Sequence, residues 1–151
     1  MGWCLWGCSK PVPLRQPMAF SHVLHMQADL KCASCHMGAE DGTLAGFPTL
    51  ADCLDCHHKV QGSRPDESTV RVYQQEKREI AWERVNRLPA HVHFPHAAHV
   101  TLAKIPCESC HEGILAANAP LTLPDARFTM ASCMACHREK RANNDCNACH
   151  R

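Results

Sequence analysis

The sequence predicts a mostly irregular fold with short α-helices and little or no sheet, and two features of its composition support that prediction. Ten prolines are spread along the 151 residues, and each interrupts regular backbone hydrogen bonding. Only four Phe, three Trp and one Tyr stand beside twelve Cys and twelve His, so few large side chains are present to fill a core. We therefore expect the interior to be organised by something other than side chains.

A short pattern that recurs five times indicates what that is. Each copy holds two cysteines three residues apart, with a histidine directly after the second. The copies are Cys32/Cys35/His36, Cys53/Cys56/His57, Cys107/Cys110/His111, Cys133/Cys136/His137 and Cys146/Cys149/His150. We refer to them below as the first to fifth motifs.

Four kinds of site are possible for such a motif. A disulfide framework needs no histidine at a fixed offset. Zinc sites take their later ligands at variable spacings, and a thioredoxin-like dithiol would lie in an alternating pattern of strands and helices that is missing here. The remaining interpretation is c-type haem, because two thiols on one helical turn form thioethers with the porphyrin and the adjacent imidazole reaches the iron. We predict five haem c groups that form much of the core.

The chain also contains a longer internal repeat. The segments "FSHVLHMQADLKCASCH" and "FPHAAHVTLAKIPCESCH" share Phe, His and His at equal offsets before a motif, and each is followed by a second motif that a Phe precedes. We therefore predict two tandem haem modules. The expected divisions are a leader at 1–19, a two-haem module at 20–62, a connector at 63–93 and a three-haem module at 94–151.

The connector is expected to contain a helix that Ser68 or Thr69 caps and that runs to about Glu79. One side of this helix is expected to carry Val70, Tyr73, Lys77 and Ile80. An extended strap is expected to follow it.

The repeat also supplies candidates for the second axial ligand of each iron. His22, His25, His96 and His99 occupy matching places in both copies and belong to no motif, so we expect them to ligate four irons. For the fifth iron His58 is the first candidate. The alternatives are His91, His93 and Met130.

These segments resemble a known group of proteins. Phe20, His22, His25 and the first motif, repeated from Phe94, are similar to class III multihaem c-type cytochromes. The order of "QPMAFSHVLH", "CLDCHH", "IAWERVNRLPAHVHFPHAAHV", "FTMASCMACHR" and "DCNACH" resembles the pentahaem subunit of alternative complex III, and also the multihaem subunit of quinone reductase complexes. The resemblance implies a subunit of a respiratory or photosynthetic membrane complex that oxidises quinol. Its expected partners are iron–sulfur and molybdopterin-like subunits, integral membrane subunits, and another c-type cytochrome or redox acceptor.

The location expected from this chemistry is the periplasmic face of the cytoplasmic membrane, because haem c is attached outside that membrane. The opening "MGWCLWGC" lacks the basic and apolar regions of a complete signal peptide, so we expect that the start is late or trimmed. Leu5, Trp6 and Gly7 before Cys8 resemble the end of a lipoprotein cleavage signal, which predicts a lipid anchor at Cys8.

The function predicted from the sequence is electron transfer and not catalysis, because an iron with two imidazole ligands leaves no position for a substrate. One alternative is a multihaem reductase in which one haem keeps an open side. Another is a free or filament-forming multihaem electron carrier. The formal net charge of +1 gives no indication of nucleic-acid binding.

Overall fold

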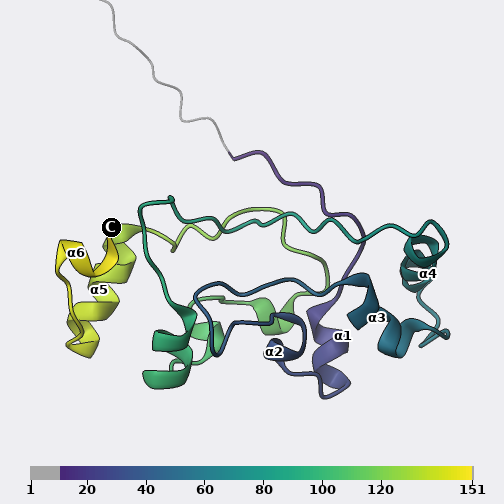
Figure 1. Ribbon diagram of the computed structural model, residues 1–151, viewed down its shortest axis with the longest axis horizontal. Helices are drawn as coiled ribbons and strands as arrows, with labels where there is room; N and C mark the ends of the chain where they lie inside the picture. The colour runs from purple at the N-terminus through teal and green to yellow at the C-terminus, as the bar shows by residue number, and fades with distance from the viewer. Residues whose placement is uncertain (1–10, 151) are drawn as a thin grey trace, which may run out of the picture.

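The computed structural model describes residues 11–150 and consists of short helical segments joined by long irregular ones (Figure 1). The α-helices are α1 (His22–Gln27), α2 (Cys32–Cys35), α3 (Leu50–His57), α4 (Ser68–Gln75), α5 (Met130–Lys140) and α6 (Cys146–Cys149). Shorter 3₁₀ or π turns are η1 (Pro65–Glu67), η2 (Ala98–Leu102), η3 (Cys107–Ser109) and η4 (Ile114–Ala116). Within residues 11–150 the β pairing is an isolated antiparallel bridge between Val92 and His150. The predicted fold class is confirmed.

The molecule is elongated, with helices at both of its ends and between them (Figure 1). Helices α3 and α4 lie at one end, α5 and α6 lie at the other, and α1 and α2 lie between them. After α4 the connector runs extended along the length of the molecule and reaches the end that holds α6. The strap predicted from the sequence therefore links the two ends.

Three helices, α1, α3 and α5, begin at a polar side chain that caps them. The Ser21 hydroxyl accepts a hydrogen bond from the Leu24 N–H at the start of α1. At α3, the side chains of Thr49 and Asp52 each accept a hydrogen bond from the other residue's N–H, which forms a capping box. Local sequence therefore fixes where these helices start.

The side-chain core is small, as the shortage of large apolar residues predicts. Leu50, Val70, Tyr73 and Ile80 are its buried apolar members among the described residues, and they gather where α3 meets α4. The Tyr73 hydroxyl also donates to the Pro17 carbonyl at 3.3 Å. The rest of the chain has to be organised in another way.

The connector helix differs in three details from the sequence prediction. It ends at Gln75 and not near Glu79, since Lys77 adopts a left-handed φ of 52° and is exposed. Neither Ser68 nor Thr69 caps it. The turn set by Pro65 precedes it directly, and the Ser68 hydroxyl donates instead to the Pro65 carbonyl at 2.7 Å. Val70 and Tyr73 are buried on α4 as predicted, and Ile80, which lies beyond the end of the helix, is buried in the same cluster.

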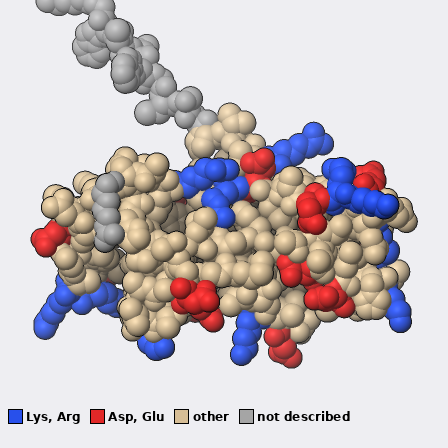
Figure 2. Space-filling model, viewed as in Figure 1, with Lys and Arg blue, Asp and Glu red and all other residues tan. Residues whose placement is uncertain are grey.

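Charged side chains of both signs are mixed on the face of the molecule seen in Figure 2. Figure 2 shows Lys and Arg interspersed with Asp and Glu on one face of the molecule, in keeping with the small net charge. Among the described helices none has the length and apolar character needed to cross a bilayer.

Candidate functional site

Each of the motifs begins on a helical segment. The first, second, fourth and fifth motifs have both cysteines on α2, α3, α5 and α6, and the third begins in η3. The spacing of three residues brings two thiols to the same side of a helical turn. None of the ten motif cysteines is paired in a disulfide within the described residues. The predicted attachment residues are therefore presented in pairs.

Imidazole rings face one another across the predicted iron positions. A metal–imidazole bond is about 2 Å long and the ring centroid lies about 1 Å behind the nitrogen, so two imidazoles on opposite sides of one metal have centroids about 6 Å apart. The observed centroid distances are 6.4 Å for His22 and His36, 6.1 Å for His25 and His57, 6.0 Å for His99 and His137, and 5.4 Å for His91 and His150. Each pair joins a motif histidine to a histidine from elsewhere in the chain.

At the third motif, burial lowers the pKa of His111, and the nearby His96 and His36 add to this effect. Of these two, His96 belongs to no motif, so it is the candidate partner of His111. Four motif histidines therefore face a histidine from elsewhere in the chain, and His96 is the candidate for the remaining one. A tetrahedral zinc site would need four ligands, and in residues 11–150 no three His, Cys, Asp or Glu side chains gather in a metal-binding cluster.

Hydrogen bonds leave one nitrogen of many of these rings available to a metal. A carbonyl that accepts from the Nδ1–H of an imidazole keeps the lone pair on Nε2. His25 Nδ1 lies 2.7 Å from the Ser21 carbonyl, and His99 Nδ1 lies 2.9 Å from the Pro95 carbonyl at the same offset in the second repeat. Other main-chain partners are Gly46 for His36, Thr43 for His96 and Asn143 for His137. His57 differs, because its Nδ1 lies 3.0 Å from the Glu67 carboxylate.

The phenylalanine of each repeat holds its two histidines at the same relative orientation. The Phe20 ring stacks on His25 at 4.3 Å and meets His22 edge-on at 4.9 Å. The Phe94 ring stacks on His99 at 4.3 Å and meets His96 edge-on at 5.0 Å. Because the geometry is reproduced in both copies, these phenylalanines orient the two candidate ligand histidines of each repeat. Their recurrence at one offset could have suggested this role from the sequence.

Two buried nitrogens near the first motif have no hydrogen-bond partner among the described residues: His22 Nδ1 and Trp82 Nε1. Buried polar atoms are normally paired, so both are available to a group such as a haem propionate. Burial lowers the pKa of His22 to about 4, with smaller contributions from His36 and His25. His22 is therefore neutral at pH 7, which is the protonation state that ligates a metal.

Thiols of different motifs lie near enough to one another to influence each other's pKa, and these neighbours indicate the order of the motifs in space. Burial raises the pKa of the Cys53 thiol to about 11 and the nearby Cys35 thiol adds to the rise. The same combination of burial and a neighbouring thiol raises the pKa values of three other cysteines. These are Cys107 beside Cys32, Cys110 beside Cys136 and Cys133, and Cys133 beside Cys149. The motifs therefore follow one another as second, first, third, fourth and fifth.

A loop that follows the first motif contacts the segment 96–101, which precedes the third motif. The Thr43 carbonyl accepts from His96, the Gly42 carbonyl accepts from the Ala97 N–H at 3.0 Å, and the Glu40 carbonyl accepts from the Thr101 hydroxyl. Gly42 has no substitute in this loop, since a Cβ there would lie 2.9 Å from the Gly38 carbonyl oxygen. The two halves of the chain thus meet through backbone atoms next to a candidate ligand.

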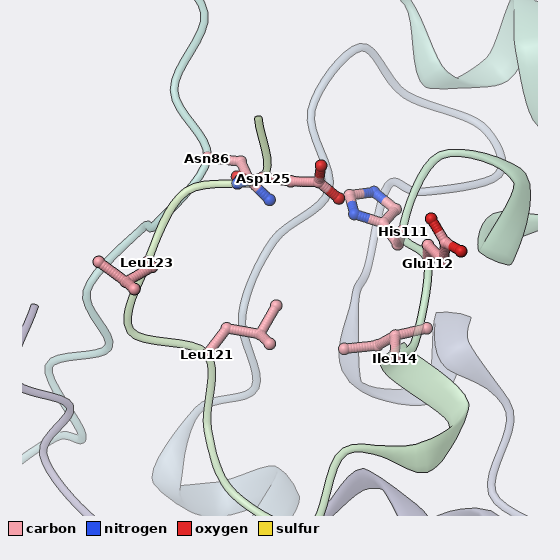
Figure 3. Close-up of a pocket in the computed structure, with 7 residues that line it drawn as sticks. All are labelled: Asn86, His111, Glu112, Ile114, Leu121, Leu123 and Asp125. Atoms are coloured by element: carbon pink, nitrogen blue, oxygen red, sulfur yellow. The ribbon is translucent and has the colours of Figure 1, made fainter. Parts of the chain in front are cut away.

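A small cavity of about 150 Å³ lies beside the third motif (Figure 3). His111 and Asp125 face each other in it, with Asn86 nearby and Leu121 and Leu123 on the apolar side. Hydrogen bonds from Arg127 lower the pKa of Asp125 to about 2. The Asn86 side chain accepts from the Asp125 N–H at 2.8 Å, which ties the extended connector to this site.

The structure brings His91, and not His58, to the fifth motif. The Val92–His150 bridge and a 2.7 Å hydrogen bond from the His93 N–H to the Cys149 carbonyl hold the connector against α6. His58 is exposed and its Nδ1 lies 3.2 Å from the Leu54 carbonyl of its own helix, and Met130 is 66% exposed. The identity of the fifth ligand stays a prediction, for which the geometry favours His91. Cys8 lies outside the described residues.

Comparison with known sequences identifies the family. Residues 8–83, about half of the chain, match the profile of the class III cytochrome c family. The chain belongs to that family. Residues 92–151 match the profile of cytochrome c7 and related cytochromes c. The protein is thus a multihaem cytochrome c that transfers electrons and carries covalently bound haem c.

A relative in Nitratidesulfovibrio vulgaris (strain Hildenborough) is named the multihaem cytochrome c subunit of menaquinone reductase. It is 39% identical over 99 residues, which cover 64% of this chain and 46% of the relative. The chain therefore spans less than half the length of that relative. This relative belongs to the second kind of complex that the sequence resembled, the quinone reductases.

Proposed function

We propose that this cytochrome binds five haem c groups, each between two imidazoles, and conducts electrons along a single row. The observation that carries the proposal is the set of facing imidazole pairs with centroids near 6 Å. When bound, each haem supplies an iron that changes oxidation state by one electron without an open coordination position. The predicted pairs are His36 with His22, His57 with His25, His111 with His96, His137 with His99, and His150 with His91.

The protein's own residues arrange these sites in a line. The thiols of successive motifs influence one another's pKa, which supports close spacing of neighbouring sites. The second motif, on α3, lies toward one end of the elongated molecule and the fifth, on α6, lies at the other (Figure 1). Electrons that enter at one end would cross every site before they leave at the other.

The proposed setting is a membrane-bound quinone oxidoreductase on the periplasmic side, either a menaquinone reductase or a complex like alternative complex III. The supporting observation is the similarity to a menaquinone reductase subunit. The proposed partners are integral membrane subunits, an iron–sulfur and molybdopterin-like subunit, and a c-type cytochrome or another redox carrier. A lipid at Cys8 would be a second means of attachment to the membrane.

Affinity purification through this subunit from gently solubilised native membranes tests the setting. We expect integral membrane and iron–sulfur subunits to co-purify, and menaquinol or a reduced periplasmic donor to exchange electrons with the haems. A matched Cys8→Ala preparation separates the two forms of attachment, since loss of a lipid leaves a complex held by subunit contacts intact. Recovery of a free cytochrome with no membrane partner would count against the proposal.

A further inference from the structure

The site at the α3 end of the row has a feature that distinguishes it from the others. His57 Nδ1 lies 3.0 Å from a carboxylate oxygen of Glu67, whose side chain is only 10% exposed. The other candidate ligands with a hydrogen bond at Nδ1 in the described part of the chain use a main-chain carbonyl. Those ligands are His25, His36, His96, His99 and His137.

Glu67 is held in place by its surroundings. It ends η1 and directly precedes α4, and Arg71 one turn along donates to the same carboxylate oxygen at 2.6 Å. Arg71 is itself only 26% exposed. The neighbouring acid, Asp66, is more exposed and pairs instead with Arg64 at 3.3 Å. Glu67 therefore presents a fixed, ionised acceptor to His57 at neutral pH.

A carboxylate changes an imidazole ligand more strongly than a carbonyl does. It draws the Nδ1 proton toward itself, which places more negative charge on the ring and makes Nε2 a stronger donor to a metal. A stronger donor stabilises the ferric state relative to the ferrous state. Outer partners of ligating histidines typically change metal affinity by about tenfold or more when they are removed.

We propose that Glu67 is a positioning residue that lowers the reduction potential of the haem held by His57, and so makes the α3 end of the row the site that most readily gives up its electron to the rest. The inference rests on the proposed ligation by His57. It assigns the α3 end as the entry side of the row, because electrons move spontaneously from lower to higher potential.

The test is a redox titration of the haem-loaded protein, followed by electron paramagnetic resonance so that individual low-spin haems are resolved. Glu67→Gln keeps the shape of the side chain and replaces the carboxylate by a neutral amide. We expect one haem to rise in potential by about 59 mV, which corresponds to a tenfold change in its ferric-to-ferrous equilibrium. The other haems keep their potentials.

Two further variants separate the contact from the charge. Asp66→Asn removes an equal charge one residue away, without contact with His57, and is expected to leave all potentials unchanged. Glu67→Asp keeps the charge but withdraws it from Nδ1, and is expected to raise the same haem by a smaller amount. The proposal would be overturned if Glu67→Gln and Asp66→Asn shifted the reduction potential equally. It would also be overturned if neither Glu67→Gln nor Glu67→Asp shifted any potential.

The intact mass and haem spectrum of each preparation distinguish this proposal from the ligation on which it depends. If wild-type protein carries no haem at Cys53 and Cys56, or if that haem lacks a second imidazole, the proposed function fails at this site. If the haem is present and low-spin but its potential ignores Glu67, the ligation stands and the tuning role is wrong.

Discussion

The His91→Ala substitution distinguishes best between the candidate residues for the fifth axial ligand. The structure places the His91 ring 5.4 Å from the His150 ring and holds the connector there through the Val92–His150 bridge. Removing the imidazole would deprive one iron of a strong-field ligand and leave the other sites unchanged. With five motifs in the chain, the expected high-spin signal is about one fifth of the total iron.

The assay is quantitative electron paramagnetic resonance of the oxidised protein, with binding of carbon monoxide to the reduced protein as a second readout. His58→Ala is the matched control, because His58 is exposed and bonded back onto its own helix. It is expected to leave every haem low-spin. A His91→Ala/His93→Ala double variant excludes replacement of the ligand by the nearby His93. A one-fifth high-spin signal in His58→Ala, or a fully low-spin double variant, would refute the assignment.

The remaining predictions concern stability. Val70→Ala should lower the free energy of unfolding by about 2 kcal/mol, because Val70 is 4% exposed. Val72→Ala, on the exposed side of α4, should change this free energy little. Denaturant titration followed by circular dichroism measures both effects. Thr49→Ala removes the capping box of α3 and should cost about 1 kcal/mol by the same measurement. Asp125 has a folded pKa of about 2 against an ordinary 3.8, so its bonds with Arg127 stabilise the fold fully above about pH 4 and are lost as the pH falls toward 2. Thermal melts over that range should show a smaller pH dependence in Asp125→Asn than in wild type.

The fold class was predictable, and the candidate attachment residues can be named, because their signals are local. Two cysteines and a histidine within five residues define a motif without reference to the rest of the chain, and the scarcity of aromatic residues follows from composition alone. The repeat around Phe20 and Phe94 likewise appears in the sequence as equal offsets. Within each motif and within each repeat, the relative positions of these residues therefore follow from the local sequence alone.

Other features depend on the path of the chain in space. His58 was the first candidate for the fifth ligand because it adjoins a motif, and only the extended course of the connector shows that His91 reaches the other end of the molecule. Glu67 is ten residues from His57 and carries no sequence signal of its role. Ser68 has the side chain of a helix cap, but the turn begun by Pro65 uses its hydroxyl instead.

The most direct test of the central claim is anomalous diffraction at the iron absorption edge from crystals of the haem-loaded protein. The claim is that paired imidazoles hold five irons in one row. The expected map has five iron peaks in the order His57, His36, His111, His137, His150, each between the two imidazoles assigned above, with His91 at the last. Fewer peaks, a peak ligated by His58, or irons that follow one another in sequence order would contradict it.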